Sequence, residues 1–210
     1  GAEVTSEMEL FFRFCPCRIY GVTGSDGKTT TSSLIAAMLR QEGKTVHLGG
    51  NIGRALFPVV EEIAPSDVAV VELSSFQLIS MRQSPDVAVV TNVTPNHLDH
   101  HKDMKEYVDA KRNILLHQRP DTRAVLGREN EITRGMAADV RGERLWFSRL
   151  RPVEAGACLD PEGNLCLAKG GRLAPVVHRR EVALRGEHNI ENLLAAMAAV
   201  AGEVSPEAMA

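Results

Sequence analysis

The segment from Gly21 to Thr30 (Gly-Val-Thr-Gly-Ser-Asp-Gly-Lys-Thr-Thr) follows a short apolar run and precedes a helical pattern. Glycines at 24 and 27 allow backbone N–H groups to turn toward an anion, and the N-terminus of a helix attracts negative charge. Lys28 adds a positive charge, and Thr29 offers a hydroxyl to magnesium. The segment therefore predicts a site for the phosphates of ATP, whereas a glycine-rich turn that merely starts a helix is the alternative.

The match is to a variant of the general phosphate loop, because Val22 stands where that pattern has its first glycine. The pattern present is Gly-x-x-Gly-Lys-Thr. Its position between a strand-like run and a helical run is the context in which such a loop binds phosphate.

Other polar residues follow the next strand-like runs. Glu72 comes directly after Val68–Val71, Asn51 follows the run 45–48, and Ser74 lies two residues beyond Glu72. Ligands of an open parallel sheet gather at the carboxyl ends of its strands. Glu72 is therefore predicted to lie near the magnesium of a bound nucleotide, with a solvent-facing glutamate as the alternative.

The run His97-Leu98-Asp99-His100-His101 is compatible with a zinc site, a proton relay or a hydrated loop. Zinc is the least favoured, because no cysteine is near and a structural site closes with four ligands. The position of His97 after the run 87–93 favours it over the other histidines. A hydrolase built on Ser74, His97 and Asp99 is not supported, because no Gly-x-Ser-x-Gly motif surrounds the serine.

Lys111 lies on the apolar stripe of its predicted helix, together with Met104, Tyr107, Ile114 and Leu115. Its stem could pack while the ammonium reaches water. Burial of the ammonium would instead lower its pKa, making the neutral amine accessible. Such an amine can react with carbon dioxide, and the resulting carbamate would be a carboxylate-like magnesium ligand.

Strand-like runs alternate with helical patterns along the first 150 residues, which is typical of a parallel sheet. The runs are 19–23, 45–48, 68–73, 87–93, 124–126 and 145–147. We expect an α/β fold of the phosphate-loop type: a three-layer, mostly parallel sheet with helices on both faces, plus a small antiparallel β annex.

The order of helical, strand-like and turn-rich stretches along the sequence suggests four parts. Residues 1–17 would form a lead-in helix and linker, 18–150 the α/β core, 151–185 the antiparallel β subdomain, and 186–210 a returning helix with a short C-terminal segment. The chain starts without Met, and Ser205-Pro206-Glu207 announces a helix shortly before the last residue. We therefore expect this chain to be part of a longer protein.

Composition excludes some classes of function. The formal net charge is -3 and aromatic residues make up 4%, which disfavours nucleic acid as a partner. No apolar run is long enough to span a bilayer, so no membrane association is expected. The four cysteines form no Cys-x-x-Cys pair and are expected to be reduced thiols of a cytoplasmic protein.

Taken together, these motifs resemble the central domain of the Mur ligases in both order and spacing. Within that family, the stretch Glu72–Leu78 is most similar to the branch that adds D-glutamate. The segments that carry the resemblance are 23–31, 50–53, 72–78, 92–99, 107–111 and 186–192. Ile79 and His100 depart from the family pattern, which has an acidic residue and Arg there.

The resemblance implies a role for each matching residue. Lys28 would meet the terminal phosphate, Asn51 and Ser74 would contact a muramoyl-alanine substrate, and Asn189 and Asn192 would contact adenine. Two magnesium ions are implied, one on Thr29 and Glu72 and one on His97 and carbamylated Lys111. The residues implied to bind ATP phosphates are Gly24, Ser25, Asp26, Gly27, Lys28, Thr29 and Thr30.

By the same resemblance, a carboxylate of UDP-N-acetylmuramoyl-L-alanine would become an acyl phosphate, and the amine of D-glutamate would displace the phosphate. The family's N-terminal uridine-binding and C-terminal domains are not recognised in these 210 residues, so we expect this chain alone to bind ATP weakly, to ligate little and to be a monomer. A relative that adds another amino acid, or glutamate to folate, stays an alternative. A nucleotide-dependent ATPase switch and a pure binding module also stay open.

Overall fold

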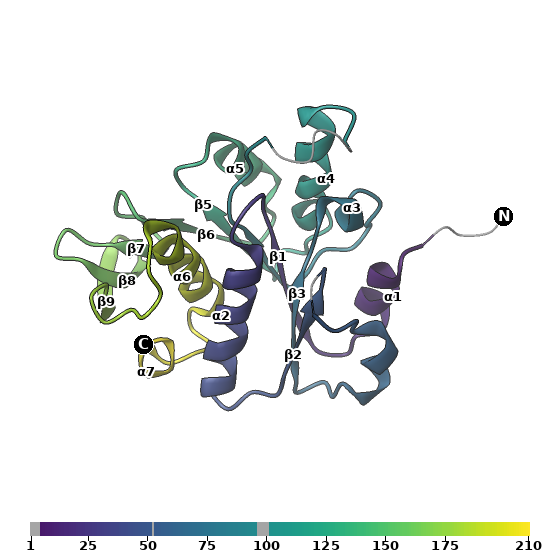
Figure 1. Cartoon of the computed structure of the whole chain (residues 1–210), viewed down its shortest axis with the longest axis horizontal. Helices are drawn as coiled ribbons and strands as arrows, with labels where there is room; N and C mark the ends of the chain where they lie inside the picture. Colours follow the sequence, from purple (N-terminus) through teal and green to yellow (C-terminus); the bar gives the residue numbers. More distant parts are fainter. Residues whose placement is uncertain (1–4, 52, 96–100) are drawn as a thin grey trace.

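The computed structural model describes residues 5–51, 53–95 and 101–210 and shows a single nine-stranded sheet flanked by helices (Figure 1). The strand order is β2-β3-β1-β4-β5-β6-β7-β8-β9. Strands β1 to β6 pair in parallel, and β7 also pairs in parallel with β6. The expected α/β fold is confirmed.

The strands are β1 Arg18–Thr23, β2 Val46–Gly50, β3 Val68–Glu72, β4 Val87–Val90, β5 Arg123–Gly127, β6 Glu143–Ser148, β7 Gly156–Leu159, β8 Asn164–Lys169 and β9 Arg172–His178. The helices are α1 Glu7–Phe14, α2 Lys28–Gln41, α3 Ser75–Leu78, α4 Met104–Leu116, α5 Glu131–Gly135, α6 Glu187–Val200 and α7 Pro206–Met209, with 3-10 helices η1 Phe57–Glu62 and η2 Met136–Asp139.

The central strands are buried on both faces, and alternate residues face opposite layers. Tyr20 and Val22 of β1 pack with α2 and α6, whereas Ile19 packs in the layer of α1, α3 and α4. The same alternation runs through β3, where Val70 and Val71 enter different clusters. This explains why the strand sequences are continuously apolar.

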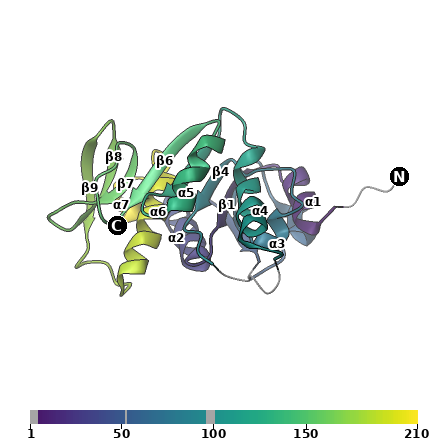
Figure 2. The same ribbon diagram turned by 90° about the horizontal axis from the view of Figure 1, so that it is seen from above.

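The strands of the predicted annex extend the main sheet. β7 pairs antiparallel with β8, and β8 with β9, and the three strands form the end of the molecule opposite α1 (Figure 2). The parallel pairing of β6 with β7 joins them to the rest of the sheet. The predicted antiparallel pairing of the annex is therefore confirmed. The four-part division of the chain stays a prediction.

Helix α6 is more buried than its sequence pattern indicates. The spacing of Ile190, Leu194, Met197 and Ala201 in the sequence predicts a helix with one buried side. Every residue from Asn192 to Val200 is buried, because α6 packs against the sheet and against α2, while Ala201 lies beyond the helix end. A helix enclosed in this way needs no polar face.

The termini of the elements match local capping signals. Ser6 caps α1 by accepting a hydrogen bond from the Glu9 N–H, and Ser205 caps α7 in the same way, with Pro206 at its first position. Among the described residues, no helix is both long and apolar enough to cross a membrane.

Candidate nucleotide and metal site

The loop between β1 and α2 requires glycine at two positions. Gly24 has φ +152° and Gly27 has φ +80°, in the region that side chains disfavour. A Cβ at Gly24 would lie 1.8 Å from Thr91 Oγ1, and one at Gly27 would lie 2.2 Å from Asn192 Oδ1. The loop is therefore packed against both β4 and α6.

Two backbone amides of the loop are already engaged. Ser25 N donates to the carbonyl of Asn92, and Asp26 N donates to Asn92 Oδ1. The first intrahelical bond of α2 runs from Thr31 N to Gly27 O. The amides that precede Thr31 in this helix have no intrahelical acceptor, so the first turn of α2 is where an anion would be bound.

The side chain of Ser25 holds the loop in place through hydrogen bonds to residues that follow β4 and to α4. Ser25 is buried, and its Oγ donates to Thr94 O at 2.9 Å, accepts from Thr94 N and lies 3.0 Å from Tyr107 Oη. Thr91 Oγ1 donates to Asp26 O at 2.6 Å. β4 ends at Val90 and not at Val93 as predicted: the N–H of Thr91 still bonds to Thr23 O of β1, but the side chains of Thr91 and Asn92 both donate to Asp26 O of the loop.

Two lysine ammonium groups converge on one carbonyl. Lys28 Nζ donates to Gly24 O at 3.1 Å and to Ser25 O at 2.9 Å, and Lys111 Nζ donates to the same Gly24 O at 2.9 Å. Only 1% of Lys111 is exposed, so its stem does not carry the ammonium to water. The unusual position of Lys111 in the sequence is thus a buried position in the fold.

Burial and, to a smaller extent, the positive charge of Lys28 lower the pKa of Lys111 to about 7, whereas Asp26 acts in the opposite direction. The ammonium also lies 4.6 Å from the centre of the Tyr107 ring. At such a pKa, about half of the amine is neutral near pH 7. The neutral amine is the form that reacts with carbon dioxide.

Glu72 lies at the carboxyl end of β3, 2% exposed, beside the first turn of α2. Thr29 Oγ1 donates to Glu72 Oε2 at 2.8 Å, and Asn51 Nδ2 donates to Oε1 at 3.3 Å. A hydroxyl and a carboxylate beside an anion site suit Mg²⁺, which takes few protein oxygens and keeps several waters. The residues present therefore fit a magnesium ion.

The structure describes the contacts of Ser74 and His101 but not those of His97. Ser74 caps α3 in a reciprocal arrangement with Gln77, so its hydroxyl contacts the protein itself. His97 lies outside the described residues. His101, passed over in the sequence, is buried and bonds Ser75 Oγ through Nε2 at 2.9 Å, which joins α3 to α4.

Near the N-terminus of α6, Asn192 lies against Gly27 of the loop, and Asn189 bonds to Asn192. Asn192 Oδ1 accepts from Thr31 Oγ1 at 3.4 Å, and Asn192 Nδ2 donates to Asn189 Oδ1 at 3.3 Å. Asn192 is buried, whereas Asn189 is half-exposed beside it. Of the two side chains, Asn189 is therefore the more accessible.

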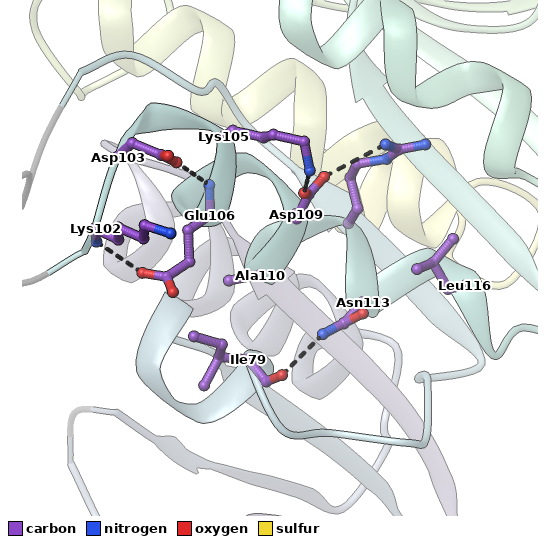
Figure 3. A pocket seen from close by; sticks show the side chains of 10 residues that line it. Ile79, Lys102, Asp103, Lys105, Glu106, Asp109, Ala110, Asn113 and Leu116 are labelled. Atoms are coloured by element: carbon purple, nitrogen blue, oxygen red, sulfur yellow. Dashed lines mark hydrogen bonds and ion pairs between the residues drawn. The ribbon is translucent and has the colours of Figure 1, made fainter.

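A charged groove of about 520 Å³ runs along the side of α4 that does not carry Lys111 (Figure 3). Lys105 and Asp109 pair across one turn of the helix, and Asn113 donates to the backbone of Ile79. None of the residues predicted from sequence to bind ATP or metal lines this groove. Within the described part of the chain, no three His, Cys, Asp or Glu side chains form a metal cluster.

Comparison with known proteins gives a consistent picture. Residues 22–200 match the family model described as the Mur ligase middle domain. The UDP-N-acetylmuramoylalanine--D-glutamate ligase of Acetivibrio thermocellus is 51% identical over 200 residues, which is 95% of this chain and 43% of the relative. The enzyme of the same name from Ruminiclostridium cellulolyticum is 44% identical over the whole chain and 45% of its own length.

Solved structures share the fold. The structure of UDP-N-acetylmuramoyl-L-alanyl-D-glutamate--2,6-diaminopimelate ligase matches with a TM-score of 0.73 at 24% identity, over 92% of this chain and 45% of that one. The Neisseria meningitides UDP-N-acetylmuramate:L-alanyl-gamma-D-glutamyl-meso-diaminopimelate ligase also gives a TM-score of 0.73, at 19% identity, over 98% of this chain and 68% of that one.

The chain spans a little under half the length of the curated relatives that it matches. The family model, by contrast, covers most of the chain and includes the loop, Glu72, Lys111 and the two asparagines of α6. By this match and by its fold, the chain belongs to the Mur ligase middle-domain family.

Proposed function

We propose that this chain is the ATP-binding part of a ligase that joins D-glutamate to UDP-N-acetylmuramoyl-L-alanine. The observation that carries the proposal is the clustering of charge around Gly24: Lys28 and Lys111 share its carbonyl, and Thr29 is bonded to Glu72. The names and identities of the curated relatives support the choice of D-glutamate as the added amino acid.

In this proposal the first turn of α2 and Lys28 bind the phosphates of ATP, while Asn189 and Asn192 lie toward adenine. Ser25 positions the loop by bonding to Thr94 and Tyr107, and its role is to hold the loop rather than to bind phosphate through its hydroxyl. Asn51 and Ser74 lie toward the muramoyl substrate. The observed cap of α3 limits Ser74 to contacts compatible with its bond to Gln77.

Thr29 and Glu72 would hold one magnesium ion, and carbamylated Lys111, with His97, would hold a second. Bound magnesium neutralises the charge that gathers on a phosphoryl group during transfer. The substrate carboxylate is a poor electrophile, so one of its oxygens would first attack the terminal phosphorus of ATP, which forms an acyl phosphate and releases ADP. The amine of D-glutamate would then displace phosphate and form the amide. We also propose that the reaction takes place in the cytoplasm.

The experiment is a calorimetric titration of the chain with ATP, with and without magnesium. Glu72→Gln keeps the size of the side chain and removes its charge, so we expect it to abolish most of the magnesium-dependent gain in affinity. Substitution of a residue that supports a metal ligand typically costs about 10- to 100-fold in metal affinity, so loss of the charge on a ligand itself should cost at least about tenfold. The matched control is Glu61→Gln at an exposed position.

Equal magnesium dependence in Glu72→Gln and the parent chain would contradict the metal assignment. Absence of ATP binding in the folded parent chain would contradict the proposed function itself.

A further inference from the structure

The thiols of Cys15 and Cys17 lie in contact at the junction of α1 and β1, away from the loop. Their Sγ atoms are 3.5 Å apart, although only Pro16 separates them in sequence. Cys15 ends α1 with extended dihedrals, φ −64° and ψ 119°, and residues two apart on extended backbone face the same side. The backbone itself therefore brings the two sulfur atoms together.

The two thiols differ in access and in charge. Cys15 is partly exposed, whereas Cys17 is buried at 7% exposure. The hydrogen bond from Cys17 lowers the pKa of Cys15 against the opposing effects of burial and of the Asp86 carboxylate. The same contact raises the pKa of Cys17, together with burial and the charges of Cys15 and Asp67. Cys15 is therefore the more accessible sulfur and the one whose pKa is lowered, and Cys17 is the buried thiol held against it.

We propose that Cys15 and Cys17 form a modification site at which a hydroperoxide oxidises the pair to an intramolecular disulfide. An accessible thiolate next to a second thiol is the arrangement from which such oxidation proceeds to a disulfide. The inference concerns the α1–β1 junction and is independent of the proposed ligase function.

The chemistry is balanced within the pair and the peroxide. Cys15 sulfur attacks the peroxide, so an S–O bond forms, the O–O bond breaks, and the departing alkoxide or hydroxide takes a proton from water. Cys17 then loses its proton and attacks Cys15 sulfur, so the S–S bond forms and the S–O bond breaks with release of water. Two thiols are oxidised and one peroxide is reduced by two electrons. The sulfur atoms must approach by about 1.5 Å to reach disulfide length.

Cys158 and Cys166 provide an internal control. They lie opposite each other across β7 and β8, but both are fully buried. Trypsin, which does not cleave before proline, releases Cys15 and Cys17 in the peptide 14–18 and the control pair in the peptide 150–169. The two pairs are therefore measured separately in one digest.

The test is mass spectrometry of the 210-residue chain after mild hydrogen peroxide. We expect the peptide 14–18 to lose two hydrogen atoms, reversibly with dithiothreitol, while the peptide 150–169 stays reduced. An unchanged peptide 14–18, its irreversible gain of oxygen, or a disulfide between two copies of the chain would each overturn the proposal.

Single variants test which thiol reacts first. In Cys17→Ser, dimedone should trap a sulfenic acid on Cys15; in Cys15→Ser, labelling of Cys17 should be at least about tenfold slower, because the thiolate reacts and the buried thiol does not. Equal labelling rates in the two folded variants would overturn the assignment. Cys17→Ala serves if the serine variant does not fold, as judged by circular dichroism.

Discussion

Lys111 and Glu72 are buried charged side chains whose partners define the site. Glu72 is satisfied by Thr29 and Asn51, whereas the ammonium of Lys111 has a neutral carbonyl and an aromatic ring as its partners, with a second ammonium group nearby. The surroundings of Lys111 therefore oppose its charge, and its pKa is lowered.

The lowered pKa of Lys111 predicts a pH-dependent stability. Between the folded pKa of about 7 and the unfolded value near ~10.4, the unfolded chain binds more protons, so stability rises with pH across that window. Lys111→Met removes this dependence. In denaturant unfolding from pH 7 to 9.5, the free energy of unfolding of the parent chain should rise relative to that of the variant, by up to about 1 kcal/mol per pH unit.

The matched control for this measurement is Lys44→Met, because Lys44 is exposed. A stability difference between the parent chain and Lys111→Met that stays constant or shrinks with rising pH would show that Lys111 is charged in the fold.

At the residue level, sequence was informative where a side chain breaks its local pattern. Lys111 on an apolar stripe and Glu72 after a buried strand were both identifiable, and the structure brings them together with Lys28 and Thr29. Thr91 and His101 were missed, because their roles depend on contacts with Asp26 and Ser75, far away in the sequence. Nothing local in the sequence marks such tertiary hydrogen bonds.

Among the elements, the loop is coupled to α6 through Gly27. A side chain at Gly27 would meet Asn192, so Gly27→Ala combines backbone strain with displacement of α6. We expect it to destabilise the chain by about 1–3 kcal/mol and to abolish ATP binding, as measured by thermal unfolding and calorimetry.

Gly43→Ala is the matched control, since Gly43 has a similar φ of +85° and no neighbour within 4 Å of the added Cβ. It should show the cost of backbone strain without loss of ATP binding. Equal effects of the two substitutions on ATP binding would contradict the coupling of the loop to α6.

The boundaries of the elements could be predicted where they depend on residues nearby in the sequence, but not where they depend on tertiary contacts. The caps of α1 and α7 were readable, because Ser6 and Ser205 act on their own helices. The early end of β4 and the enclosure of α6 were not, because they depend on what packs against those segments. The hairpins of β7–β9 were readable from turn residues, but their pairing with β6 was not.

For the whole molecule, one continuous sheet carries both the loop and the antiparallel end. A ligand that binds only the folded state stabilises that state, so we expect ATP to raise the unfolding temperature of this chain. The curated relatives are more than twice as long as this chain, so we expect these 210 residues alone to bind ATP weakly and to form little or no amide. Phosphate release and product mass, measured with both proposed substrates, check this expectation, and substantial amide formation would contradict it.

The most direct test is a crystal structure of the chain with a nonhydrolysable ATP analogue and magnesium, grown with bicarbonate. The account predicts phosphates on the first turn of α2 beside Lys28, a metal ion on Thr29 and Glu72, and extra density on the amine of Lys111. A nucleotide bound elsewhere, or a metal ion that contacts neither Glu72 nor Lys111, would contradict it.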